Sequence, residues 1–103
     1  MKARRRIAFR RIADAAQPNV GVLVPRWLPD GRREGTEWIA LNPLRLDRRK
    51  GSFKVNLRTG RWSDFAVDES GGDLVSLAAY LFHLKQGQAA VKIAGALGIE
   101  AYE

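Results

Sequence analysis

The 103-residue chain carries 18 Lys and Arg against 11 Asp and Glu, a net charge of +7 at pH 7. Its hydrophobic fraction of 46% suffices for one small core, which excludes a wholly disordered chain and predicts a single domain over residues 1–103. The lack of Cys and the single His exclude disulfides, cysteine nucleophiles and thiolate zinc sites. No apolar run forms a signal peptide or reaches the roughly 20 residues that span a bilayer, so we expect a cytoplasmic protein with no membrane partner.

The positive charge is concentrated in residues 1–62, which hold 16 basic and 5 acidic side chains, whereas residues 63–103 hold 2 and 6. Most of the basic residues are Arg, whose planar guanidinium suits bidentate contacts with phosphates. This distribution favours a nucleic-acid partner. The alternative is a charge that only keeps a small protein in solution.

In chain order, apolar residues first recur at helical spacing between Ile7 and Ala16, which predicts a basic N-terminal helix over residues 5–16 that ends before Pro18. The segment 20–27 is ambiguous, because its Val content favours a strand whereas Pro18 suits the first turn of a helix. A turn at 29–31 and a strand over 37–41 follow.

Two further strands are predicted over 52–57 and 61–67, joined by a turn at 58–60. In the strand over 52–57, apolar and polar residues alternate strictly. In the second, Trp62 and Phe65 break the alternation and indicate a bulge. The alternating strand directs Phe53, Val55 and Leu57 to one face, and Lys54 and Asn56 to the other.

The period then changes to that of a helix, with Asp73 as its N-cap. We favour a strand-to-helix turn over a phosphate site at Gly71-Gly72-Asp73, because the carboxylate would oppose the anion. A last helix over 88–97 ends at Gly98 in a Schellman motif. We expect the apolar face of the helix after Asp73 to pack against Phe53, Val55 and Leu57. This face consists of Leu74, Leu77, Leu81 and Phe82.

These elements predict a small α+β domain with its core in residues 35–98. It has an N-terminal helix, a sheet of three or four antiparallel strands, and two C-terminal helices packed on one sheet face. The other face should be basic. Of the aromatic residues in the strands, most should belong to the core of so small a domain.

Few residues suggest chemistry by themselves. His83 has no second His or Cys to join it, so packing is its expected role. Asp64, Asp68 and Glu69 are commoner as hydrated surface acids than as ligands of a magnesium ion. Since no base, nucleophile and metal cluster can be assembled, we expect no enzyme, no catalytic residue, no metal and no cofactor.

Four short stretches between Gly35 and Gly98 resemble the zinc-binding domain at the N-terminus of bacterial and phage DNA primases. That family has Cys-Pro-x-His, then Ser-Phe-x-Val, an aromatic residue before a Cys-x-x-Cys hairpin, and Gly-Gly-Asp at the start of a helix. The matching stretches here are Asn42-Pro43-Leu44-Arg45, Gly51-Ser52-Phe53-Lys54-Val55, Trp62-Ser63-Asp64-Phe65-Ala66-Val67 and Gly71-Gly72-Asp73-Leu74.

The four zinc-ligand positions of the family fall on Asn42, Arg45, Asp64 and Val67. Val67 cannot bind zinc and Arg45 repels it, so the resemblance implies a zinc-ribbon-like domain that has lost the metal. It further implies recognition of single-stranded DNA by the sheet face, without catalysis, in the replication or priming of a phage or mobile element.

Two functional hypotheses follow. The first is a single-stranded DNA-binding module, with RNA as the alternative ligand, in which basic residues neutralise phosphates while Trp62 or Phe65 stacks on a base. The arginines of residues 4–11 are a competing location for this binding. The second is a non-catalytic adaptor that docks on a replicative helicase, primase or polymerase. In the first hypothesis the basic residues are Arg45, Arg48, Arg49, Lys50, Lys54, Arg58 and Arg61.

Overall fold

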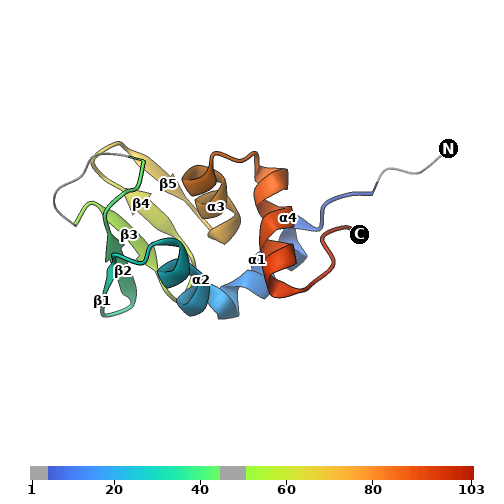
Figure 1. The fold of residues 1–103 in the computed structure, drawn as a ribbon, viewed down its shortest axis with the longest axis horizontal. Coiled ribbons are helices and arrows are strands. Elements are labelled where there is room, and N and C mark those ends of the chain that lie inside the picture. Colours follow the sequence, from blue (N-terminus) through green and yellow to red (C-terminus); the bar gives the residue numbers. More distant parts are fainter. Residues whose placement is uncertain (1–4, 45–50) are drawn as a thin grey trace.

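The computed structural model describes residues 5–44 and 51–103, and it confirms an α+β fold with an N-terminal helix, an antiparallel sheet and two C-terminal helices (Figure 1). None of the described helices is long and apolar enough to cross a membrane. In chain order the elements are α1 (Phe9–Ala16), a 3₁₀ turn η1 (Gln17–Asn19), α2 (Val20–Trp27), β1 (Arg32–Glu34), β2 (Glu37–Ala40), β3 (Phe53–Asn56), β4 (Trp62–Asp64), β5 (Glu69–Gly71), α3 (Leu74–Phe82) and α4 (Gln86–Leu97).

The ambiguous segment 20–27 is a helix. Its residues Val20, Leu23 and Val24 lie at helical spacing, and all three are buried in the core. The preceding helix α1 ends before Pro18, as predicted, and the proline sits in the short 3₁₀ turn between the two helices. Burial of one face against the core thus outweighs the strand preference of Val.

The sheet has five strands in the order β1-β2-β3-β4-β5, each antiparallel to its neighbour, rather than the three or four predicted. The predicted strand over 61–67 is wrong, because β4 ends at Asp64 and a turn leads into β5. The Asp64 carboxylate accepts a hydrogen bond from the backbone N–H of Ala66 (3.0 Å), which starts this turn, and Asp68 completes it with a positive φ of 55°. The turn takes the place of the expected bulge.

The hydrophobic core lies between one face of the sheet and the helices. Phe53, Val55 and Trp62 from the strands are buried together with Leu74 and Leu77 of α3. Both C-terminal helices lie on this side, with α3 next to the strands and α4 packed on α3 and α1 (Figure 1).

The prediction for one member of the apolar face of α3 is wrong. Phe82 is 37% exposed, and its ring meets Trp27 of α2 edge-on, with 5.7 Å between ring centroids. It stands at the C-terminal end of α3, where the contact available is α2 rather than β3. The other three predicted members are buried.

The two helix ends singled out in the sequence have the predicted geometry. The Asp73 carboxylate accepts the Ser76 N–H at 2.9 Å, as an N-cap does. At the end of α4, Gly98 adopts a left-handed conformation (φ 69°), and the Ile99 N–H bonds to the Ala94 carbonyl at 3.0 Å, as in a Schellman motif.

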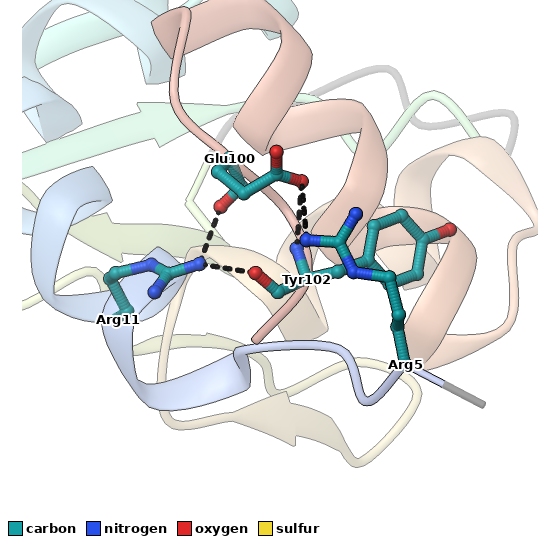
Figure 2. Close-up of polar contacts among 4 residues, drawn as sticks. All are labelled: Arg5, Arg11, Glu100 and Tyr102. Atoms are coloured by element: carbon teal, nitrogen blue, oxygen red, sulfur yellow. Dashed lines mark hydrogen bonds and ion pairs between the residues drawn. The ribbon is translucent and has the colours of Figure 1, made fainter. Parts of the chain in front are cut away.

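The two ends of the described chain are joined by backbone and side-chain contacts (Figure 2). Ile7 forms an antiparallel bridge with Tyr102, which explains why α1 begins at Phe9 and not at residue 5. The Arg11 guanidinium donates to the carbonyl oxygens of Glu100 (2.9 Å) and Tyr102 (2.8 Å). Arg5 pairs with the Glu100 carboxylate at 3.7 Å and lies over the Tyr102 ring.

Candidate functional site

Two of the four positions that the resemblance aligns with zinc ligands of primase domains meet in the structure. Asn42 donates a hydrogen bond to the Asp64 carboxylate (2.8 Å) and another to the Tyr80 hydroxyl (2.8 Å). Val67 is 39% exposed and has an apolar side chain. The fourth position, Arg45, lies outside the described residues. Within the described ranges, no group of three or more His, Asp or Glu side chains could hold a metal ion.

The expectation that Asp64 is a hydrated surface acid is wrong. Its exposed fraction is 0%, because Asp64 alternates with Ser63 in β4 and therefore points to the same side of the sheet as Trp62. The carboxylate is stabilised there by donors from Asn42 and from the Ala66 backbone. Asp68 and Glu69, in contrast, are exposed as expected.

The opposite face of the sheet carries an open groove. Its central residues come from one cross-strand row, in which Lys54 of β3 is paired in register with Ser63 of β4, and Ser63 with Ser70 of β5. The groove has a volume of about 630 Å³. It is lined by Glu37, Lys54, Asn56, Arg61, Trp62, Ser63, Ser70, Gly71 and Gly72.

Lys54 and Arg61 are the cations of this groove. Neither side chain forms an ion pair or hydrogen bond with any described residue, so both charges are available to a ligand. The Ser63 and Ser70 hydroxyls are likewise uncommitted among the described residues. An ammonium group, a guanidinium and two hydroxyls offer hydrogen-bond donors suited to a phosphate group.

The prediction that the whole outer face is basic is wrong for the strands that the structure describes. Glu34 and Glu37 pair in register on β1 and β2, and they place two carboxylates on the same face as Lys54. Arg32 is tied to Glu34 by a hydrogen bond from its Nε (2.7 Å). Among the described residues of the groove on this face, Lys54 and Arg61 therefore form no ion pair, although Glu37 lines the same groove.

The predicted binding residues take different places. Lys54 lines the groove, while Arg58 and Arg61 are exposed in the segment that joins β3 to β4. Phe65 is 72% exposed in the turn after β4, where its ring is open to a base. Arg45, Arg48, Arg49 and Lys50 lie outside the described residues.

The prediction that Trp62 stacks on a base is wrong. It is 5% exposed, its indole N–H donates to the Ser76 hydroxyl (2.9 Å), and its ring lies 4.8 Å from that of Tyr80. Trp62 is fixed in this position because it shares the inward side of β4 with Asp64. As predicted, most strand aromatics belong to the core, and Phe65 is the exposed exception.

Six groove residues were not predicted as site residues: Glu37, Asn56, Ser63, Ser70, Gly71 and Gly72. Alternation along β4 could have shown that Ser63 points away from Trp62. Ser70 lies in a three-residue edge strand whose polar sequence has no pattern that would reveal it.

The competing location for binding is partly occupied by the protein itself. Arg5 and Arg11 bind the C-terminal residues Glu100 and Tyr102 (Figure 2). Arg10 lies near Asp14, one turn further along α1, at 4.0 Å. These three arginines therefore have intramolecular partners that a ligand would have to displace or share.

No protein-family model matches this sequence, and a comparison with curated proteins gives no match. The resemblance to primase domains therefore rests on the four short stretches of sequence given above.

Proposed function

We propose that this domain is a cytoplasmic single-stranded DNA-binding module that acts in the replication or priming of a phage or mobile element. The observation that carries the proposal is the groove on the outer sheet face, in which Lys54 and Arg61 stand beside uncommitted serine hydroxyls and form no ion pair with a described residue. Catalysis has no part in it.

The groove suits a flexible strand better than a duplex. Its floor is a row of short side chains that allows a backbone to approach Lys54 closely. Phe65 offers an aromatic ring to an unstacked base, and base stacking on such rings is a general mode of single-strand binding. Arg58 adds an exposed positive charge in the turn after β3.

The resemblance to primase domains supports the same function. In the structure Asn42 and Asp64 meet across 22 residues of sequence, as two ligands of one metal centre would. This contact supports a common architecture in which a hydrogen-bonded cluster occupies the position of the zinc.

An adaptor that docks on a replicative helicase, primase or polymerase is the second candidate. An apolar groove of about 550 Å³ favours it, lined by Ile7, Lys85, Gly87, Gln88, Val91 and Tyr102 where the N-terminal segment meets α4. This groove belongs to the helical part of the molecule and not to the sheet. Binding there would be far less sensitive to salt than binding to phosphates.

The test is the affinity for a short single-stranded oligonucleotide at several salt concentrations. We expect log K to fall linearly with log salt, by about 0.7 units of slope for each phosphate contacted. Lys54→Gln should weaken binding and lower the slope by about 0.7, whereas Lys92→Gln, the same change on α4, should alter neither. An affinity that does not depend on salt would reject the proposal and favour the adaptor.

The two basic segments can be separated by a second pair of variants. Arg48→Ala with Arg49→Ala should weaken binding about equally for all sequences and lower the slope by about 1 to 2 units. Removal of residues 1–4 leaves the contacts of Arg5 and Arg11 in place, so it tests a basic arm without disturbing the fold. If that truncation abolishes binding while the double variant binds normally, the sheet face is not the site.

A further inference from the structure

The groove on the outer sheet face has two chemically different ends. At one end stands the row of donors formed by Lys54, Ser63 and Ser70. At the other stands Glu37 of β2, a half-buried carboxylate. Among residues 5–44 and 51–103, Glu37 takes part in no side-chain hydrogen bond or ion pair. A carboxylate accepts hydrogen bonds and donates none, so a ligand that binds at this end of the groove must offer N–H donors.

The neighbour of Glu37 does not satisfy it. Asn56 is paired with Glu37 in register, but no hydrogen bond joins its N–H₂ group to the Glu37 carboxylate, and its side-chain oxygen accepts the N–H groups of Arg58 (2.8 Å) and Thr59 (3.1 Å). The Asn56 side chain is thus held by the turn after β3. Glu37 is left as a free acceptor at its end of the groove.

The separation of the two ends suits one nucleotide. Glu37 is the diagonal neighbour of Lys54 across β2 and β3, and such neighbours lie roughly 7–8 Å apart. Long side chains extend this span, so a phosphate at Lys54 and the hydrogen-bonding edge of its own base at Glu37 fit the same groove. Each end would bind the part of the nucleotide that the other end repels.

Among the four DNA bases, guanine matches a carboxylate best. Its N1–H and N2–H₂ groups lie side by side and can donate to both carboxylate oxygens, in a bidentate pair like that of arginine with an acid. Cytosine and adenine each offer one amino group beside a ring nitrogen that is itself an acceptor. Thymine offers one N–H between two carbonyl oxygens, which a carboxylate repels.

We propose that Glu37 makes the sheet groove a guanine-reading subsite for single-stranded DNA, with the phosphate of the same nucleotide at Lys54. This inference rests on the proposed function. Contacts with phosphates carry no base information, so in this arrangement base preference depends on Glu37.

The test uses thymidine oligonucleotides of about twelve residues, within the range of single-strand site sizes, in which the central base is guanine, cytosine, adenine or thymine. We expect the guanine oligonucleotide to bind about tenfold more tightly than the thymine one. Glu37→Gln should remove this preference and improve the relative binding of adenine and cytosine. The reason is that an amide presents one acceptor and one donor, which match the amino group and ring nitrogen of those bases.

The matched control is Glu69→Gln, which makes the same change of charge in β5 at an exposed side chain outside the groove. It should keep the guanine preference. Thermal melts of both variants verify that the fold is intact.

The possible failures are distinguishable. If no oligonucleotide binds at low salt, the proposed function fails together with the inference. If all four bind with equal affinity and a steep salt dependence, only the inference is overturned. A guanine preference that survives in a folded Glu37→Gln protein also overturns it, since another group must then read the base.

Discussion

Asn42 donates a 2.8 Å hydrogen bond to the carboxylate of Asp64, and both side chains are almost completely buried, with exposed fractions of 1% and 0%. The same amide group of Asn42 reaches the Tyr80 hydroxyl of α3, and its oxygen accepts the Leu44 N–H. One side chain thereby joins the segment after β2, the end of β4 and the helix above them. A metal ion achieves the same cross-linking in a zinc-binding domain.

Loss of this cross-link should destabilise the fold. Asn42→Ala removes the two donated bonds and the acceptor of the Leu44 N–H from a buried site, so we expect a loss of about 1–3 kcal/mol in the free energy of unfolding. Tyr80→Phe removes only the hydroxyl and should cost about 0.5–1.5 kcal/mol. The control is Tyr102→Phe, whose hydroxyl has no described partner and whose change should be within about 0.5 kcal/mol. Urea denaturation measures all three, and equal stability of Asn42→Ala and the parent would contradict the role of the cluster.

A chelator should leave the protein unchanged. Because hydrogen bonds join Asn42 to Asp64, and Val67 has no ligand atom in its side chain, we expect the melting temperature to be the same with and without EDTA. Elemental analysis of the purified protein supplies the second measurement. Stoichiometric zinc, or unfolding on chelation, would show that the cluster binds a metal after all.

Leu77 marks the centre of the helix-on-sheet packing. It is fully buried in the core that contains Phe53 and Val55, so Leu77→Ala should cost about 2–5 kcal/mol, a large share of the stability of a small domain. Val22→Ala is the control, because Val22 is exposed on α2 and should change stability by less than about 0.5 kcal/mol. A Leu77→Ala protein that melts at the temperature of the parent would be inconsistent with this core.

Phe65 should matter for binding and not for stability. Its ring is 72% exposed, so Phe65→Ala should weaken oligonucleotide binding by about 1–3 kcal/mol while leaving the melting temperature unchanged. Phe9→Ala, at an exposed phenylalanine of α1, is the control and should leave binding intact. If Phe65→Ala binds the oligonucleotide with the affinity of the parent, base stacking on Phe65 does not contribute to binding.

The regular elements with buried faces could be predicted from the sequence. β3 alternates strictly, α3 has its N-cap and apolar stripe, and α4 ends at a glycine, so each carries a local signal that agrees with its final packing. The helix α2 also carries such a signal in the spacing of Val20, Leu23 and Val24. Propensity alone obscured it, since Val favours strands.

The edge strands could not be predicted. β1 and β5 consist of three residues each, with no buried residue in either, and they are strands only because β2 and β4 offer them hydrogen-bonding partners. Both edge strands contribute to the outer face. β5 supplies Ser70 to the groove, and β1 supplies the carboxylate of Glu34. The buried hydrogen bond of Asp64 was equally hidden, since its partner Asn42 lies 22 positions away in the sequence.

The contacts of Arg11 and Ile7 with the C-terminal segment have a kinetic consequence. Arg11 and Tyr102 lie 91 positions apart. If this loop closed early in folding, nearly the whole chain would lose conformational entropy, and only a few hydrogen bonds would form in return. We therefore expect the strap between residues 6–8 and 101–103 to form last and to open first. The amide hydrogens of Ala8 and Glu103, bonded across it at 2.8 Å, should exchange with solvent while those of β3 remain protected.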